Sequence, residues 1–454
     1  MWLEVRNIQT KVARATDEEV AWLSSYLSFE DARARFRGGG DQRFRLFNGI
    51  SMTFPSGLLP LVQRGAVKEG FTIELADRRV VPLQADMAAD LAWLRDYQLE
   101  AVDTIVAKAR GILHIVTGGG KTECFAALTR RLPGKWLFLV HRTTLVDQAA
   151  DRVELRTGAS VGRVGEGRWC SFSDEQRIIC ASFQTLHARL VEPEAQALLA
   201  QADGVCVDEC HTIPAETFYR IVMMTRGAYW RVGLSGTPLA RGDKRSVLAI
   251  SALGPVVYRI KPERLITAGV LTRPRIRLVP VAQQSDKPTW QGVYGECIVR
   301  SKARNRALVE AARRAPKPCL VFVKEIAHGR LLDKAIRSGG LRSEFVWGSD
   351  SSTARRGAVK RLVRSDIDVL VCSVVFQEGV DIPELQSVIV GSGGRSAIAA
   401  LQRIGRGMRV AEGKTEFVVY DIKDVGNKWL ERHTRERIRA YTSEGHETII
   451  ESTV

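Results

Sequence analysis

Short apolar runs alternate repeatedly with longer segments of helical pattern along most of this chain. One series of apolar runs covers 111–116, 135–140, 177–182 and 204–208, and a second covers 319–323, 367–373, 385–390 and 416–421. Runs that are apolar throughout, rather than at every second residue, are typical of parallel strands covered by helices on both faces. The pattern therefore predicts two α/β domains, each built on a parallel sheet.

The length of the chain and the positions of Pro and Gly indicate its domain boundaries. Its 454 residues leave room for about three domains. Residues 259–278 contain Pro and Gly and are interpreted as the connection between the two α/β domains. The pattern before residue 88 is different, so this region is predicted to be a small α+β accessory domain. We therefore expect domains at 1–88, 89–262 and 263–454.

The chain is strongly basic, with a net charge of +16 and a pI near 9.7. The excess lies mainly in residues 263–454, which hold 33 Lys and Arg against 22 Asp and Glu, whereas residues 1–88 hold 12 against 11. A basic surface attracts polyanions such as nucleic acids, but it also keeps proteins soluble. Charge alone therefore does not assign a partner.

Two further classes are disfavoured by composition. No apolar run approaches the roughly 20 residues of a membrane span, and the N-terminal ten residues lack the apolar core of a signal peptide. We therefore expect a protein of the cytoplasm, of its own cell or of a host cell, with no membrane partner. The eight cysteines form no CxxC pair, which favours buried free thiols over a zinc site.

A nucleotide site is predicted directly after the first apolar run. There the chain reads Thr117-Gly118-Gly119-Gly120-Lys121-Thr122 and continues as an apolar helical segment. Glycines let backbone N–H groups surround a phosphate, and the N-terminus of the following helix adds its positive dipole. Lys121 would reach the β- and γ-phosphates of ATP, and the Thr122 hydroxyl would hold Mg²⁺. The strict pattern has Gly where this chain has Ile115, and a Gly-rich turn without a ligand is the alternative.

An acidic pair follows the run 204–208. Asp208, at the carboxyl end of a predicted strand, can hold Mg²⁺, and the adjacent Glu209 can act as the general base that activates water. An acidic pair after a strand is weak evidence by itself. Combined with the phosphate loop, it predicts a site that hydrolyses ATP.

At this point the order of motifs resembles that of the superfamily 2 DExH-box helicases. The matching segments are Arg95-Asp96-Tyr97-Gln98, the loop 117–122, Asp208-Glu209-Cys210-His211, Ser235-Gly236-Thr237-Pro238, Phe376 to Pro383, and Gln402 to Arg409. The resemblance implies two tandem RecA-like domains that use ATP and Mg²⁺. It also implies that Arg95 and Gln98 recognise adenine and that His211, Ser235 and Thr237 couple hydrolysis to domain movement. Gly379, Asp381 and Gln402 would complete the ATP site.

The predicted ATP site takes residues from both α/β domains. Lys121 and Arg406 lie in different predicted α/β domains. Arg406 and Arg409 can neutralise the charge that develops on the γ-phosphate, as arginine fingers do. ATP would then bring the two domains together and hydrolysis would release them, which is the behaviour of a motor.

A nucleic-acid track is implied by the same resemblance. Its predicted contacts are His141, Arg142 and Thr143, then Ser182, Gln184 and Thr185, and in the second domain Ser373. Hydroxyl, amide and guanidinium groups suit sequence-neutral contacts with phosphates. Ser373 can also be read as a cap at the end of a strand. Few aromatic residues accompany these segments, so we expect backbone tracking rather than base stacking.

The choice between DNA and RNA depends on the N-terminal region. Residues 36–48 and 53–59 resemble the small N-terminal domain of UvsW-type phage recombination helicases, which is related to the damage-recognition region of XPB. The usual Trp-Asp-Gly is replaced here by 39–42, Gly-Gly-Asp-Gln, and an unrelated cap is the alternative. Residues 427–441 are similar to a tail of such phage and RadD-like helicases, and equally to a basic surface helix. The resemblance implies a phage-encoded monomer that acts on single-stranded, forked or branched DNA with other recombination or replication proteins.

Three other functions remain open on the sequence. They are an RNA helicase, the motor subunit of a restriction system, and a non-catalytic nucleic-acid clamp. Intact Lys121, Glu209 and Arg406 argue against the clamp. Residues 283–297 form either a strand-separating wedge or a surface insertion, and the sequence favours the insertion.

Overall fold

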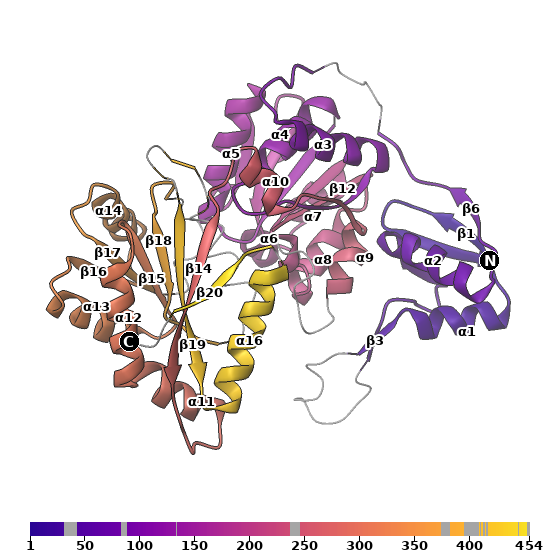
Figure 1. Cartoon of the computed structure of the whole chain (residues 1–454). Coiled ribbons are helices and arrows are strands. Elements are labelled where there is room, and N and C mark those ends of the chain that lie inside the picture. Colours follow the sequence, from indigo (N-terminus) through magenta and orange to yellow (C-terminus); the bar gives the residue numbers. More distant parts are fainter. Residues whose placement is uncertain are drawn as a thin grey trace. The chain divides into compact units, whose positions relative to one another are not determined.

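The computed structural model describes most of the chain (Figure 1). The described residues are 1–30, 43–82, 89–132, 134–236, 246–373, 382–394, 408, 410–411, 414, 416–443 and 445–451. They form two compact units, one of Met1–Ile115 with Gly120–Ile260 and one of Val116–Gly119 with Lys261–Val454. Within these described ranges, no helix has the length and apolar character to cross a membrane.

The first unit begins with a small α+β module around a four-stranded sheet of order β5-β2-β1-β6. Its elements are β1 (Trp2–Val5), β2 (Gln9–Arg14), α1 (Asp17–Tyr26), the hairpin strands β3 (Ser28–Glu30) and β4 (Arg43–Arg45), β5 (Thr53–Pro55), the 3₁₀ turn η2 (Ser56–Leu58), α2 (Leu59–Glu69) and β6 (Glu74–Asp77). Helix α1 starts with a capping box, in which Thr16 and Glu19 each satisfy a backbone N–H of the other.

A parallel sheet of seven strands follows in the first unit, in the order β13-β7-β12-β11-β8-β10-β9. Its strands are β7 (Arg110–His114), β8 (Trp136–Val140), β9 (Val161–Val164), β10 (Ile178–Ser182), β11 (Gly204–Asp208), β12 (Trp230–Ser235) and β13 (Val256–Arg259). Its helices are α3 (Asp96–Lys108), α4 (Lys121–Arg131), α5 (Thr144–Thr157), α6 (Phe183–Ala188), α7 (Pro193–Gln201), the short η3 (Cys210–Thr212), α8 (Glu216–Met224) and α9 (Ser246–Leu253). The apolar runs predicted as parallel strands in this half of the chain are therefore confirmed.

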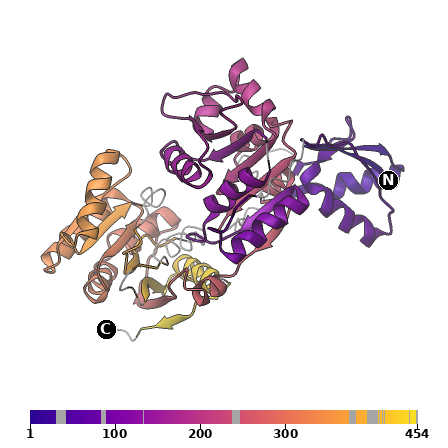
Figure 2. The same ribbon diagram turned by 90° about the horizontal axis from the view of Figure 1, so that it is seen from above.

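The α+β module packs on this sheet domain through apolar and polar contacts (Figure 2). Val247 and Ile250 of α9 belong to the hydrophobic cluster of the module. Gly57 lies so close to α9 that a Cβ there would come within 2.2 Å of the Ile250 carbonyl oxygen. Asn7 Nδ2 donates to the carbonyl of Gly227 at 2.8 Å. The module and the first sheet domain are therefore one packed body.

The second unit is built on another parallel sheet of seven strands, in the order β16-β17-β15-β18-β19-β14-β20. Its strands are β14 (Pro274–Ala282), β15 (Cys319–Val323), β16 (Ser343–Val346), β17 (Val369–Ser373), β18 (Ser387–Val390), β19 (Phe417–Val425) and β20 (Thr448–Ile450). Its helices are α10 (Pro262–Thr267), α11 (Trp290–Val293), the π-helix η4 (Tyr294–Val299), α12 (Lys302–Arg314), α13 (Ile326–Ser338), α14 (Ser352–Val363) and α16 (Lys428–Ser443).

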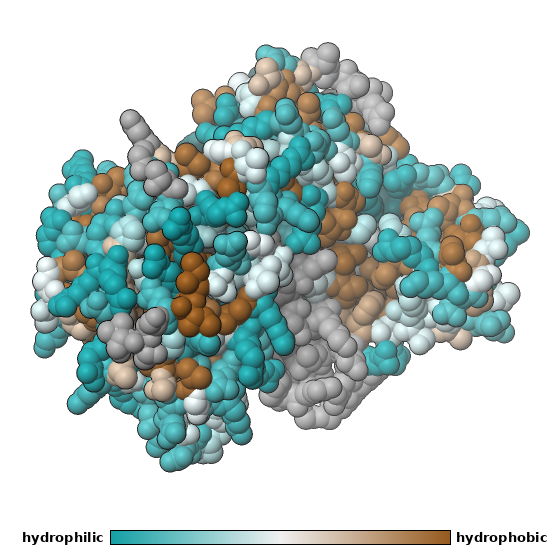
Figure 3. All heavy atoms as spheres, viewed as in Figure 1, coloured by the Kyte–Doolittle hydropathy of each residue, from teal (hydrophilic) through white to brown (hydrophobic). Residues whose placement is uncertain are grey.

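The second sheet differs from expectation at its connection and at its edge. The predicted connection 259–278 ends early, because Pro274 already begins β14, whose residues alternate between the sheet interior and the surface. The C-terminal segment adds the edge strand β20, on which Ile449 and Ile450 are more than half exposed. Figure 3 shows hydrophobic surface at this position.

Candidate ATP site and nucleic-acid track

The predicted site residues of the first unit gather at the carboxyl edge of its sheet. Neighbouring strands β7, β12, β11, β8 and β10 lead in that order to Gly120–Thr122 of the predicted phosphate loop, Ser235, Asp208, His141–Thr143 and Ser182. Ligands of open α/β sheets bind at this edge, since the loops that leave parallel strands meet there. The topology thus brings together residues that are more than 100 positions apart in the chain.

The loop between β7 and α4 has the backbone conformation of a phosphate cradle. Gly118 and Gly120 have φ angles of +88° and +81°, which other residues adopt only with strain. A side chain at Gly120 would also place its Cβ 2.1 Å from Nε2 of Gln98. The N–H of Gly119 donates to the carbonyl of Val116 at 3.0 Å, and α4 begins at Lys121. The backbone N–H groups of the loop therefore lie directly before the N-terminus of α4, and such a helix N-terminus binds anions.

Lys121 and Glu209 form an ion pair between the loop and the acidic strand end. Lys121 Nζ lies 2.7 Å from Glu209 Oε1, and the two side chains are 11% and 22% exposed. Burial works to raise the pKa of Glu209, but Lys121 and His211 outweigh it, so the pKa is well below its usual range. Burial works to lower the pKa of Lys121, and Glu209 and Asp208 outweigh that effect and raise it. Both groups are therefore charged at neutral pH.

Asp208 ends β11 beside this pair. Burial raises the pKa of Asp208 to about 6, although Lys121 acts in the opposite direction. Its Oδ1 atom is buried and has no hydrogen-bond partner among the described residues. A buried carboxylate oxygen without a partner fits the role of a Mg²⁺ ligand, because this ion prefers oxygen donors. The hydroxyl of Thr122, which follows Lys121 in the chain, is a second oxygen donor.

His211 connects the acidic pair with the end of β12. Its Nδ1 lies 3.3 Å from Glu209 Oε2 and 3.1 Å from Ser235 Oγ. The Nε2 atom of His114 lies 2.8 Å from the carbonyl oxygen of Gly236. The sequence gives no sign of this contact, because His114 stands inside an otherwise apolar run. Burial lowers the pKa of His114 to about 4, and the charge of Arg259 adds to this shift. The predicted coupling residue Thr237 lies outside the described residues.

The start of α3 contributes the buried side chain of Gln98, and its N-cap residue Arg95 contributes an exposed one. Gln98 is buried, and its Oε1 accepts a hydrogen bond from the Arg95 N–H at 2.9 Å. Arg95 is exposed at the start of α3. Gln98 therefore lies against the phosphate loop at Gly120, and the predicted recognition of adenine by Gln98 and Arg95 remains a prediction.

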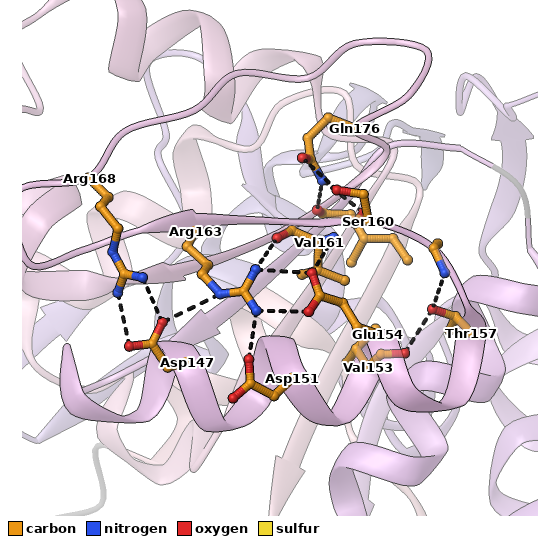
Figure 4. Close-up of polar contacts among 12 residues, drawn as sticks. Asp147, Asp151, Val153, Glu154, Thr157, Ser160, Val161, Arg163, Arg168 and Gln176 are labelled. Carbon is orange, nitrogen blue, oxygen red and sulfur yellow. Dashed lines mark hydrogen bonds and ion pairs between the residues drawn. The ribbon is translucent and has the colours of Figure 1, made fainter.

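Helix α5 is held between the phosphate-binding helix and the edge of the sheet by ion pairs. On one side, Arg152 and Arg156 both pair with Glu123 in the first turn of α4. On another side, the helix presents three carboxylates to two arginines (Figure 4), and the members of this group are Asp147, Asp151, Glu154, Arg163 and Arg168. None of these residues belongs to a sequence motif. Helix α5 follows the predicted track residues 141–143. Only the fold shows that ion pairs attach this helix to α4, which begins at the phosphate loop.

The track residues of the first unit lie on neighbouring strands. Ser182 pairs with Val140, so the segments that follow β8 and β10 leave the sheet side by side. Ser182 is fully buried, and its Oγ accepts the Thr185 N–H at 3.1 Å as the N-cap of α6. Gln184 is exposed in the same turn. This N-cap hydrogen bond explains why Ser182 and Thr185 stand at these positions. Contact of either residue with nucleic acid remains a prediction.

In the second unit, Ser373 ends β17, and its buried Oγ has no hydrogen-bond partner among the described residues. The other predicted site residues of this unit lie outside the described ranges, namely Gly379, Asp381, Gln402, Arg406 and Arg409. Their roles remain predictions.

Comparisons with protein families match both sheet domains. Residues 92–240 match the model described as "Type III restriction enzyme, res subunit", and residues 303–411 match "Helicase conserved C-terminal domain". The first match includes the phosphate loop and the acidic pair. The second includes Ser373 and the predicted arginine fingers.

Curated relatives are similar over most of this chain. It is 28% identical to the DNA 3'-5' helicase XPB of Kineococcus radiotolerans, over 71% of this chain and 58% of that protein. It is 24% identical to the ATP-dependent DNA helicase uvsW of Enterobacteria phage T4, over 77% of this chain and 75% of that protein. The chain spans only 52% to 64% of the length of four other curated relatives that it matches.

Among solved structures, the fold is similar to that of the ATP-dependent Type ISP restriction-modification enzyme LlaBIII bound to DNA. The TM-score is 0.57 at 17% identity, over 79% of this chain and 31% of that chain. Together with the two parallel sheets, this likeness confirms the predicted fold class of two tandem RecA-like domains with a small N-terminal α+β region.

Proposed function

This chain carries the paired domains of a superfamily 2 helicase, and from that premise we propose that it hydrolyses ATP to move along DNA and to remodel forked and branched DNA. The observation that carries the proposal is the pair of Lys121 and Glu209, 2.7 Å apart, where a phosphate loop meets an acidic strand end. A Gly-rich loop with an unrelated role has no need of a charged carboxylate beside its lysine.

ATP binding would change the partners within this pair. The γ-phosphate competes with Glu209 for Lys121, and the carboxylate so released is charged and can accept a proton from the attacking water. When bound, Mg²⁺ would be held by Thr122 and Asp208 and would offset the negative charge of the phosphates. His211 contacts both Glu209 and Ser235, so a change at Glu209 reaches the end of β12.

DNA as the substrate is supported by the relatives, several of which are named DNA helicases or a DNA translocase. The two parts of the track in the first unit leave neighbouring strands, as a continuous contact with a phosphate backbone requires. Residues 263–454 carry a large excess of positive charge. Binding should therefore weaken steeply with salt, because each phosphate contact releases counterions.

The preference for branched DNA is proposed for the N-terminal module. Its net charge is low, so it adds little to general affinity for DNA. Its hairpin of β3 and β4 exposes Arg43 and Arg45 on a strand that is held by stacking of Phe29 on Phe44. The module packs on the first sheet domain, so it would move together with the ATP site.

The test compares ATPase stimulation and unwinding on single-stranded DNA, linear duplex, forked DNA, a four-way junction and RNA. We expect forks and junctions to stimulate most. The double variant Arg43→Ala/Arg45→Ala should retain stimulation by single strands and lose the preference for junctions, whereas Arg64→Ala on α2 of the same module is the matched control. Greater stimulation by RNA than by every DNA would contradict the proposal, and an unchanged junction preference would move branch recognition elsewhere.

A second candidate is the motor subunit of a restriction system. It is favoured by the match of residues 92–240 to a restriction-enzyme subunit and by the fold of LlaBIII. Such a motor follows duplex DNA, so closed circular duplex should stimulate its ATPase as well as a junction does. A remodeller of branched DNA should respond weakly to a circle without ends or branches.

A further inference from the structure

An aromatic cluster lies in the second unit, in the segment that the sequence indicates to be a surface insertion rather than a wedge. The segment after β14 folds into α11 and the π-helix η4, which pack against the start of α16. The ring of Trp290 contacts the ring of His433 edge to face, and their centroids are 4.3 Å apart. The centroid of the Tyr294 ring lies 5.5 Å from that of Trp290. Trp429 packs against the same cluster. Two segments more than 100 residues apart thus form one group of rings.

Exposure within the cluster is uneven. Tyr294 and His433 are buried, whereas Trp290 and Trp429 keep part of their surface in solvent. Trp290 and Trp429 therefore offer part of their indole surface to solvent beside the buried Tyr294 and His433.

The cluster is located at the carboxyl edge of the second sheet. Val323, the last residue of β15, pairs with Ser373 at the end of β17, the predicted phosphate contact. Lys324 follows Val323, and its Nζ lies 5.1 Å from the centre of the Tyr294 ring. The ring of Tyr294 therefore lies beside the residue that follows β15, and β15 is the strand next to β17 in the sheet.

The cluster is rigidly fixed to the sheet. Tyr294 donates its hydroxyl hydrogen to the carbonyl of Ser392 at 2.8 Å, in the loop after β18. Arg304, fully buried, pairs with Asp424 at 3.0 Å and donates to the carbonyl of Gly391 at 2.7 Å. Gln283 bonds to the carbonyl of Cys297 at 2.6 Å. Such support fixes the geometry of a binding site before its ligand arrives.

Basic side chains accompany the cluster, together with the exposed Glu296 of the π-helix. Lys324 and Lys428 are exposed, and Lys428 lies 5.4 Å from the Trp429 ring centre. Arg300 is exposed at the end of the π-helix. Partly exposed indoles with cations beside them match a strand of bases joined by phosphates, in which the rings stack on bases and the cations contact the backbone.

We propose that Trp290, supported by the cluster of Tyr294, Trp429 and His433, is a stacking platform for an unpaired base of the DNA strand that passes Ser373. This inference rests on the proposed DNA function and adds a residue that recognises bases to a track expected to contact only the backbone. It also assigns residues 283–297 a role in binding the separated strand. Stacking is independent of sequence, since every base has a π-face.

The test uses the full-length protein without ATP and two labelled strands of equal length and charge, an oligothymidylate and an oligomer of abasic sites. Fluorescence anisotropy gives the Kd of each. We expect the natural protein to bind the base-bearing strand roughly 10-fold more tightly or better. Trp290→Ala should lose most of this ratio, and Trp290→Phe should keep most of it. Trp22→Ala, which removes a partly exposed indole from the N-terminal module, should leave the ratio unchanged.

A variant that removes one positive charge separates the contribution of phosphate contacts from that of base stacking. Lys324→Gln should weaken binding to both strands similarly and lower the salt slope by about one, because one phosphate contact is lost. Circular dichroism and thermal melting verify that each variant is folded, and Trp290→Phe retains the packing if Trp290→Ala does not fold. Equal weakening of both strands by Trp290→Ala would overturn the platform and make Trp290 structural.

The two proposals fail in different ways. If the natural protein binds both strands with a steep salt dependence and equal affinity, the platform is wrong and the DNA motor stands. If it binds neither strand, the proposed DNA function fails and the platform fails with it.

Discussion

The carboxyl edges of the two parallel sheets share a backbone plan and differ in how they hold their charges. At the first edge, Lys121 and Glu209 are 11% and 22% exposed. At the second edge, the pair of Arg304 and Asp424 is 0% and 2% exposed, and Arg437 with Asp421 is 2% and 1% exposed. The first pair can exchange partners with a ligand that arrives from solvent, whereas the others are closed to water.

This difference separates charges that take part in chemistry from charges that hold a structure. Breaking a buried pair leaves an uncompensated charge, so its loss is expected to affect folding. Opening a partly exposed pair costs less, because water and phosphate can replace either partner. Substitutions at the first edge should therefore change ATP hydrolysis, and substitutions at the second edge should change the free energy of unfolding.

The largest effect is expected from Lys121→Ala. ATP turnover should fall by orders of magnitude, because no other cation of the loop reaches the phosphates. DNA affinity and the melting temperature should change little. Steady-state ATPase, anisotropy and thermal melting measure these three properties, with Lys108→Ala on the exposed end of α3 as the control. Normal turnover in Lys121→Ala would reject the phosphate loop.

Glu209→Gln should have the next largest effect. It preserves the shape of the side chain and removes the base, so single-turnover hydrolysis should slow by about 10²–10⁴-fold while ATP still binds. A rate within a few-fold of the natural protein would show that water is activated by another group. Nucleotide binding, followed by a fluorescent ATP analogue, verifies that the site is intact.

At the second edge, Arg437→Met should destabilise the fold. Arg437 pairs with Asp421 at 2.8 Å, and Tyr441 also donates to that carboxylate. Losing the arginine leaves Asp421 buried without its charge partner, at a cost of about 3–5 kcal/mol in the free energy of unfolding. Urea denaturation measures this loss, and Arg435→Met on the exposed face of the same helix is the control. Equal stability of the two variants would contradict the structural role of the pair.

The contact between the N-terminal module and α9 gives a smaller effect. Gly57→Ala forces a Cβ against the backbone of Ile250, and this overpacking should cost about 1–3 kcal/mol. Limited proteolysis should then release the module at lower denaturant concentrations. Gly49→Ala is a matched control in the same module, because nothing lies within 4 Å of a Cβ there. If both variants resist proteolysis alike, the module does not depend on this contact.

The last effect is confined to mildly acidic conditions, and it is a dependence of stability on pH at the first edge. Burial lowers the pKa of His114 to about 4, whereas its unfolded value is about 6.5. His114 therefore contributes stability fully above pH 6.5, and this is lost as the pH falls toward 4, because the unfolded chain binds the proton first. His114→Gln should flatten melting temperature against pH in this window. The exposed His187→Gln is the control, and an unchanged profile in His114→Gln would assign the acid sensitivity to other groups.

Much of the first edge could be predicted from local sequence. Lys121, Asp208 and Glu209 occur in contiguous motifs next to apolar runs, and those runs are the strands observed. The contacts of His114 with Gly236 and of Glu123 with Arg152 could not be predicted, since nothing in either segment identifies its partner. The expectation that base stacking is minor rested on aromatic residues near the motifs. Trp290 and Trp429 are remote from them in sequence and adjacent only in the fold.

The two parallel sheets, the phosphate loop and the acidic strand end can all be located from the order of the residues. These depend on hydrophobic periodicity and on backbone conformations that few residues adopt, and both are local properties. Which buried charges pair, the packing of the N-terminal module on α9, and the approach of the two indoles on α11 and α16 become visible in the folded chain alone. Such contacts depend on strand order and side-chain packing between distant segments, and a single sequence does not specify its partners across that distance.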